Sequence, residues 1–141
     1  MPGKFNYEVR HKYPHLIGDD TEVWNRFILK FPDKFDTVDY DVHVGSGTDP
    51  NFIKGDKTGE YWSMLTKKRI DVVAFKDNFV TIIEVKKRSS VFTLGQILGY
   101  KFLYLREHPE IKVVSTLIVC ATIYQDDIDV LNHYGINFVI V

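Results

Sequence analysis

Apolar side chains recur along this chain at two spacings, which predict an alternation of helices and strands. Between positions 20 and 31 they recur every three or four residues, as on one face of a helix, and Pro32 follows. Between positions 35 and 44 every second residue is apolar, as in a strand with one buried face. Similar runs predict strands at 69–75, 81–86, 113–121 and 136–141, and helices at 91–106 and 126–133.

These elements follow the order α-β-β-β-α-β-α-β and form a single domain, residues 1–141. Helices precede the last two strands, so those strands are expected to be parallel members of a mixed sheet that helices flank on both faces. The stretch 45–59 is rich in Gly, Asp, Ser and Thr and predicts a long loop, and 60–66 predicts a helical turn. The sequence therefore predicts an α/β fold.

Two elements have an expected inner face. In the strand at 35–44, strict alternation places on one face Val38, Tyr40, Val42 and Val44. The other face then carries Asp39, Asp41 and His43. In the helix at 91–106, the stripe expected to face the core is Leu94, Ile97, Leu98, Phe102 and Leu105.

Three charged residues interrupt the two apolar strands at 69–75 and 81–86. Asp71 lies in the first strand, and Glu84 and Lys86 lie two residues apart in the second, so those two side chains point the same way. A short turn at 76–78 makes the strands a hairpin, which can set Asp71 beside Glu84. Two carboxylates and a lysine there suit metal-assisted phosphodiester hydrolysis. The alternative is an ordinary ion pair on a solvent-facing strand.

Composition limits the partners and the compartment. A formal net charge of −1 gives no global attraction to nucleic acid, so any DNA-binding surface must be a local patch. The single cysteine, Cys120, lies in an apolar run, which predicts a reduced core thiol in a cytoplasmic protein. Neither a signal peptide nor an apolar stretch of about 18 residues is visible in the sequence, so no membrane partner is expected.

The motifs of this chain resemble those of the PD-(D/E)XK nuclease superfamily over residues 19–121. Asp71, Glu84 and Lys86 match the family's Asp and Glu-X-Lys positions, while Ile70 stands where the nominal pattern has Pro. Gln96 and Tyr100 match the Gln-X-X-X-Tyr motif of the branch that contains RecB-type and phage lambda-type exonucleases. The resemblance implies a restriction-endonuclease-like α-β-β-β-α-β core, to which residues 122–141 add an α-β unit.

The resemblance also assigns roles to individual residues. It implies a Mg²⁺ or Mn²⁺ ion held by Asp71, Glu84 and the Val85 carbonyl, with Lys86 orienting a water molecule or stabilising the transition state. Gln96 and Tyr100 would hold a substrate phosphate or support the site.

An acidic residue on the first helix would complete the metal's outer ligation. Glu22 has the residue type that the family usually shows. Periodicity favours Asp20, which shares the apolar stripe of that helix, although a helix cap explains Asp20 as well. Asp20 is therefore the preferred candidate for this outer metal ligand, and Glu22 is the second candidate.

Basic residues bracket the site and could form the local patch for a phosphate backbone. They are Lys67, Lys68, Arg69, Lys87 and Arg88. The alternative is that these residues are solvated strand ends. An apolar last strand with an open edge also favours a symmetric homodimer.

Together these features predict a metal-dependent deoxyribonuclease that acts in the cytoplasm. The resemblance adds an association with phages and mobile elements, and the cytoplasm would then be that of the host. The alternative is a catalytically silent nuclease-fold module that binds DNA or serves as a structural component of a phage particle or recombination assembly. The residues do not separate DNA from RNA, or an exonuclease from an endonuclease.

Overall fold

A computed structural model describes residues 3–46 and 68–141 of the chain. Within these ranges, six strands form one mixed sheet in the order β1-β2-β3-β4-β5-β6. The strands are β1 (Phe5–Asn6), β2 (Thr37–Val44), β3 (Lys68–Lys76), β4 (Phe79–Ser89), β5 (Val114–Ile123) and β6 (Phe138–Ile140). The helices are α1 (Asp19–Lys30), α3 (Val91–Glu107) and α4 (Gln125–His133). The predicted order of elements is confirmed, with β1 added in front. None of the helices in the described ranges is long and apolar enough to cross a membrane.

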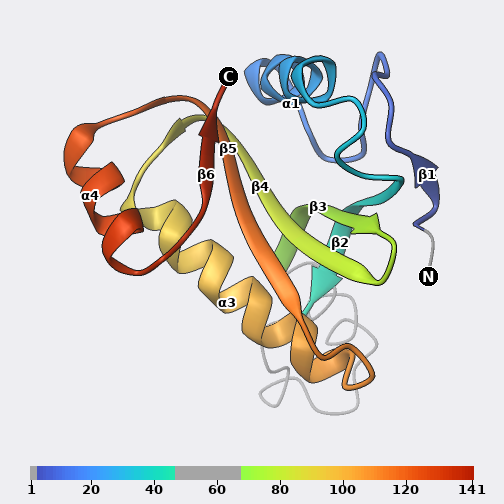
Figure 1. The fold of residues 1–141 in the computed structure, drawn as a ribbon. Coiled ribbons are helices and arrows are strands. Elements are labelled where there is room, and N and C mark those ends of the chain that lie inside the picture. The colour runs from blue at the N-terminus through green and yellow to red at the C-terminus, as the bar shows by residue number, and fades with distance from the viewer. Residues whose placement is uncertain (1–2, 47–67) are drawn as a thin grey trace, which may run out of the picture.

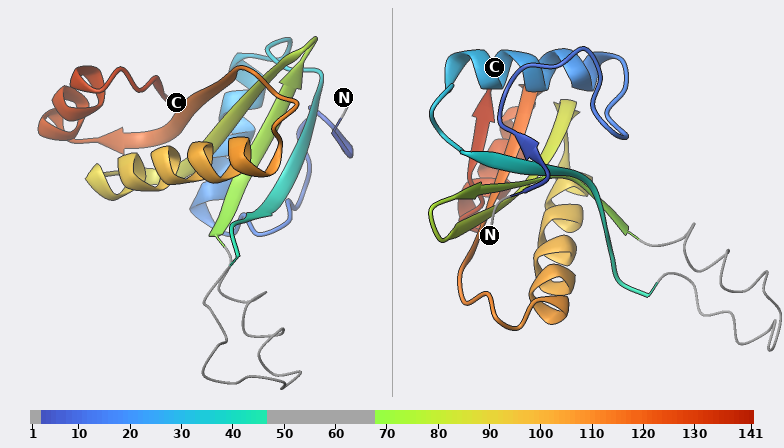
Figure 2. Two further views of the ribbon diagram at one scale, coloured as in Figure 1. Left: turned by 90° about the horizontal axis from the view of Figure 1, so that it is seen from below. Right: turned by 90° about the vertical axis from the view of Figure 1, so that its right-hand side faces the viewer.

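The sheet combines an antiparallel half with a parallel half. Strands β1 to β4 pair antiparallel, whereas β5 runs parallel to both β4 and β6. Helix α3 connects β4 to β5, and α4 connects β5 to β6. Helices α1 and α3 cover opposite faces of the sheet (Figures 1 and 2), which confirms the predicted helix–sheet–helix layering.

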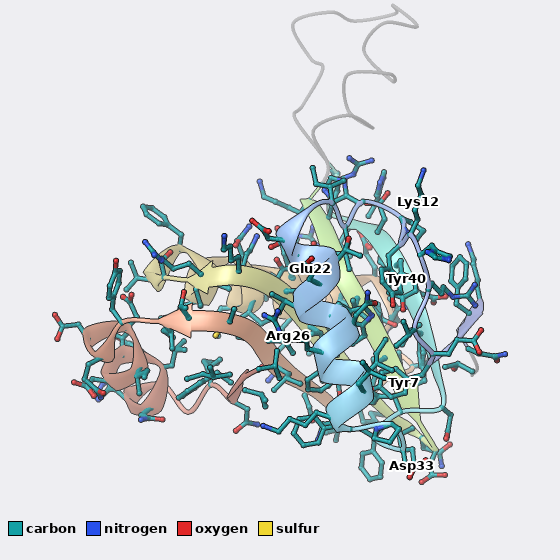
Figure 3. All side chains as sticks on the ribbon, turned by 90° about the horizontal axis from the view of Figure 1, so that it is seen from above. Tyr7, Lys12, Glu22, Arg26, Asp33 and Tyr40 are labelled. Carbon is teal, nitrogen blue, oxygen red and sulfur yellow. The ribbon has the colours of Figure 1, made fainter. Side chains whose placement is uncertain are left out.

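Helix α1 packs an aromatic face on one side of the sheet. Its buried residues are Val23, Trp24, Phe27 and Ile28. The Trp24 indole Nε1 donates a hydrogen bond of 3.1 Å to the Tyr40 hydroxyl on β2, so a buried polar group of each ring has a partner. Tyr7 and Tyr40 lie beside α1 in the view of Figure 3 and belong to this half of the core.

The expected alternation of β2 is wrong beyond its midpoint. Val38 and Tyr40 pack in the core half beneath α1, but Val44, with Val42 partly buried against it, belongs to the half beneath α3. Between the two pairs lies Asp41, whose φ of 53° is in the left-handed region. This local conformation changes the face to which later residues point, and periodicity alone does not reveal it.

The expected core stripe of α3 is also wrong in part. Ile97 is fully buried as predicted, but Leu98 and Phe102 are 44% and 64% exposed. The residues that α3 buries are Thr93, Ile97, Tyr100 and Tyr104. The helix is apolar around much of its circumference, so its spacing did not define one inner face. Tertiary packing instead turned Tyr100 toward the sheet.

Part of the predicted structure lies outside the residues that the structure describes. The predicted loop at 45–59 lies mainly outside the described residues, and the turn at 60–66 and Lys67 lie wholly outside them. Cys120 is a buried free thiol in β5, as expected. Gly135 follows α4 with a φ of 67°, the left-handed conformation that glycine accepts after a helix.

Candidate active site

Two buried carboxyl groups meet where the β3–β4 ladder ends. The last residue pair of that ladder is Val72 with Ile83, so Asp71 and Glu84 are the next residues facing one another across the two strands. The Asp71 side chain is 8% exposed and that of Glu84 is 1% exposed. Sequence reasoning expected this pair to converge, and the structure brings it together.

Side chains replace main-chain pairing at this end of the hairpin. Asp71 Oδ2 accepts a hydrogen bond of 2.9 Å from the Val85 N–H, and Glu84 Oε1 accepts one of 3.2 Å from the Asp71 N–H. Each carboxylate therefore bonds the backbone of the opposite strand. These bonds fix both groups rigidly at the point where β3 and β4 stop pairing.

Burial makes the ionised forms of both carboxyl groups unfavourable. Desolvation raises the pKa of Asp71, partly offset by the Val85 N–H and by the positive charge of Lys86. Desolvation, followed by the negative charge of Asp71, raises the pKa of Glu84 to about 9. Two like charges this close cannot both be ionised cheaply without a compensating cation.

Lys86 supplies part of that compensation. Its Nζ lies 3.7 Å from Glu84 Oε2, and its side chain is 30% exposed while that of Glu84 is buried. The ammonium thus stands between the carboxyl pair and solvent. It is placed to meet an anion that approaches the pair from outside.

Asp20 and Glu22 occupy different positions on α1. Asp20 Oδ1 accepts a hydrogen bond of 3.0 Å from the Lys87 N–H, and the charge of Asp20 contributes to the raised pKa of Asp71. Glu22 is exposed on the outer side of α1 (Figure 3). The structure therefore brings Asp20 close to the pair and leaves Glu22 away from it.

Gln96 and Tyr100 lie one turn apart on α3, and Tyr100 is the one on which the carboxyl pair acts. The Gln96 Nε2 donates a hydrogen bond of 3.4 Å to the Tyr100 hydroxyl. Burial raises the pKa of Tyr100 to about 12, and the negative charges of Glu84 and Asp71 add to this shift. Tyr100 therefore faces the carboxyl pair and keeps its proton at neutral pH.

The basic residues around the site are largely engaged with neighbours. Lys87 Nζ lies 3.1 Å from Asp19 Oδ2, and the Arg88 guanidinium lies 5.3 Å from the ring centroid of Tyr124. Four of the five basic residues predicted to contact phosphates lie within the described ranges, and all four are exposed, namely Lys68, Arg69, Lys87 and Arg88. They remain available to solvent on both sides of the pair.

Arg69 belongs to a cluster that sequence reasoning missed. Its Nε donates a hydrogen bond of 3.0 Å to His43 Nε2 and lies 3.1 Å from Asp41 Oδ1, and its Nη1 lies 3.3 Å from His15 Nδ1. His15 comes from the N-terminal segment, which has no clear periodicity, so no sequence signal pointed to it. His43 could be placed on β2 but not beside Arg69.

The chemistry of the donor set fits a hard divalent cation. Within residues 3–46 and 68–141 no group of three or more His, Cys, Asp or Glu side chains is arranged to hold a metal ion. The Asp71–Glu84 pair nevertheless offers carboxylate oxygens whose mutual repulsion a cation would relieve. Mg²⁺ commonly binds through one or two carboxylates and keeps several waters.

Comparisons with known proteins gave likeness in structure alone. No protein-family model and no curated protein matches the sequence. The crystal structure of a repair endonuclease from Pyrococcus abyssi superposes with a TM-score of 0.52 at 16% identity, covering 90% of this chain and 49% of that one. EndoMS, in its complex with dsDNA, gives a TM-score of 0.48 at 14% identity, covering 94% and 48%.

This chain spans about half the length of each of those two proteins. The six-stranded mixed sheet with helices on both faces is the fold that it shares with the matched half of the Pyrococcus abyssi enzyme. The predicted fold class, α/β with a restriction-endonuclease-like core, is confirmed.

Proposed function

We propose that this chain is a metal-dependent deoxyribonuclease of the PD-(D/E)XK type, in the branch with the Gln-X-X-X-Tyr motif. The observation that carries the proposal is the buried Asp71–Glu84 pair with Lys86 on its solvent side. Burying two carboxyl groups costs folding free energy, and their two backbone hydrogen bonds offset only part of that cost, which favours a functional role for the pair. A fold shared with a repair endonuclease supports the same proposal.

Asp71, Glu84 and the Val85 carbonyl would hold Mg²⁺ or Mn²⁺, with Asp20 in its outer ligation. When bound, such an ion lowers the pKa of a coordinated water and offsets charge on a phosphate. The backbone N–H bonds to Asp71 and Glu84 keep both carboxylates in place before substrate arrives.

Lys86 would act on the substrate side of the pair. Its ammonium, held 3.7 Å from Glu84, would orient the attacking water and stabilise the charge that develops on the scissile phosphate. The protonated Tyr100 hydroxyl and the Gln96 amide would donate hydrogen bonds to a phosphate oxygen. Lys68, Arg69, Lys87 and Arg88 would contact neighbouring phosphates without reading sequence.

The test is cleavage of linear, circular and branched DNA by the purified protein, with Mg²⁺, with Mn²⁺ and with EDTA. We expect metal-dependent cleavage that Glu84→Gln abolishes while the variant keeps its fold by circular dichroism. An RNA of matched sequence in the same assay separates a deoxyribonuclease from a ribonuclease. Absence of cleavage of every nucleic acid at all metal conditions would refute the proposal and favour the catalytically silent module.

A further inference from the structure

A cavity of about 370 Å³ lies between α3 and the start of β3, the strand that carries Asp71. Its lining residues are Lys68, Gly95, Gln96, Gly99, Tyr100 and Leu103. Tyr100 connects the two places, because it lines the cavity and the negative charges of Glu84 and Asp71 act on its hydroxyl. Gln96 also lines the cavity and donates a hydrogen bond to that hydroxyl. A ligand in the cavity would therefore lie next to whatever occupies the carboxyl site.

Two glycines of α3 leave this cavity open. Gly95 and Gly99 lie one turn apart, and a Cβ added to either would meet no described atom within 4 Å beyond its chain neighbours and the adjacent backbone of α3. Neither has the positive φ that would require glycine. Glycine in a helix interior is less favourable than alanine, so packing among the described residues does not account for this pair. Space for close approach of a ligand to the backbone accounts for both glycines.

The lining matches the chemistry of a nucleotide. Lys68 is exposed at one side and can neutralise a phosphate, whereas the helix backbone and Leu103 offer an apolar floor for a base. The Gln96 amide and the Tyr100 hydroxyl add hydrogen-bonding groups. The volume lies near the lower end of the roughly 300–1,000 Å³ typical of small-ligand sites. Such a space suits a single nucleotide and is too small for a base pair.

We infer that this cavity binds one unpaired nucleotide of the DNA strand, adjacent to the phosphate at Asp71 and Glu84. The inference rests on the proposed function and narrows its substrate to single strands or frayed ends. A base inside a duplex must leave its stack to enter a pocket of this size, and that step costs binding free energy. The unpaired strand is therefore the preferred substrate.

The test fills the cavity and leaves the carboxyl pair unchanged. Gly99→Leu places a side chain in the open space, and Leu98→Phe is the matched control, adding bulk on the same helix outside the cavity. Binding of a short fluorescein-labelled oligothymidylate is measured by anisotropy with Ca²⁺ in place of Mg²⁺. We expect Gly99→Leu to weaken binding about tenfold or more, the loss typical of one base contact, and Leu98→Phe to bind like the parent.

Thermal melting shows whether each variant is folded. If Gly99→Leu fails to fold, the double variant Gly95→Ala, Gly99→Ala fills less of the cavity and repeats the test. Unchanged oligothymidylate binding by a folded, cavity-filled variant would overturn the inference, as would equal affinity of the parent for a blunt duplex of the same length.

Cleavage assays separate this inference from the proposed function. If the parent and Gly99→Leu cleave single strands equally in Mg²⁺, the nucleotide site is refuted and the nuclease stands. A different result would be that the parent binds the oligonucleotide, the Gly99→Leu variant does not, and neither protein cleaves any DNA. In that case the nucleotide site stands and the nuclease is refuted.

Discussion

Asp71 and Glu84 are buried side by side, so their ionisation opposes folding unless a cation accompanies it. Both have a raised pKa, first because burial removes their solvation and, for Glu84, next because Asp71 is close. A pair of this kind is expected at a site whose charge is compensated by a bound ligand. The following prediction separates this account from a structural role.

Without metal, the free energy of unfolding should fall as pH rises. Glu84 has a folded pKa of about 9, above the value of about 4.3 in unfolded chains, so the folded state holds its proton more tightly. The stability from protonated Glu84 is complete below pH of about 4 and is lost as pH rises toward 9. Urea unfolding in EDTA at a series of pH values measures the slope.

Glu84→Gln should flatten this slope, because the amide cannot ionise, and should make the metal-free protein more stable at pH 8. Asp33→Asn is the control, since Asp33 is exposed just past the last turn of α1 (Figure 3), whereas Asp20 contacts β4 from the first turn. Mg²⁺ should raise the melting temperature of the parent but not of Glu84→Gln. If the stability of the parent protein changed neither with pH nor with Mg²⁺, a charge-compensated ligand site at Asp71 and Glu84 would be contradicted.

Alanine at position 86 and alanine at position 84 should impair different properties of the protein. Lys86→Ala removes a transition-state donor, so we expect a loss of about 10²–10³ in cleavage rate with folding and metal binding retained. Glu84→Ala should lose metal binding and activity together. Single-turnover cleavage and Mn²⁺ titration measure the two properties. Lys30→Ala, at an exposed lysine in the last turn of α1, at the other end of that helix from Asp20, is the charge control. Equal rates for Lys86→Ala and the parent would remove Lys86 from the mechanism.

Helix α3 combines a well-defined start with an apolar outer surface. Ser90 Oγ accepts a hydrogen bond of 3.3 Å from the Phe92 N–H, and Thr93 Oγ1 accepts one of 3.4 Å from the Ser90 N–H, which fixes the first turn. The inner face then carries Ile97 and Tyr100 to the sheet and the site. The two glycines lie beside that face and lower helix stability.

Replacing a glycine of α3 by alanine should stabilise the fold. Gly99→Ala removes an unfavourable helix residue, and its Cβ enters space that the described residues leave empty, so we expect a gain of about 1 kcal/mol. Chemical denaturation of the metal-free protein measures it. Ser90→Ala provides the opposite change and should cost about 1 kcal/mol through the lost cap. Destabilisation by Gly99→Ala would show that the space is occupied in the folded protein.

Among the described residues, the sheet has two edge strands, β1 and β6, each paired with a single neighbour. Strand β6 pairs only with β5 among the described strands, and Ile140 on it is 46% exposed. An uncovered apolar edge tends to pair with another chain, so we expect a symmetric dimer in solution at micromolar concentration. The three-residue length of β6 limits how much such pairing could contribute.

Light scattering decides whether the dimer forms. Ile140→Lys should shift the mass to that of a monomer, because a charged edge residue disfavours strand pairing. Phe79→Lys, at an exposed apolar residue next to the β3–β4 turn, is the matched control and should keep the dimer. A parent with a monomer mass at every concentration would rule the dimer out.

The spacing of residues in the sequence was enough to predict the β3–β4 hairpin and the carboxyl pair that it carries. The two-residue period of a strand put Glu84 and Lys86 on one side, and a short turn put Asp71 opposite Glu84, because both relations depend on residues close in the chain. The order of helices and strands followed from the same periodicity. These are properties of the backbone that packing had little freedom to alter.

Tertiary structure decided what periodicity leaves open. Spacing gives the relative faces of residues but not which face meets the sheet, so the burial of Tyr104 and the exposure of Phe102 appeared only in the packed helix. The left-handed Asp41 redirected β2, and Asp20 reached Lys87 across 67 residues of chain. Such contacts depend on how elements that are distant in the sequence pack together. That packing is determined by many core residues at once and not by the residue type at any single position.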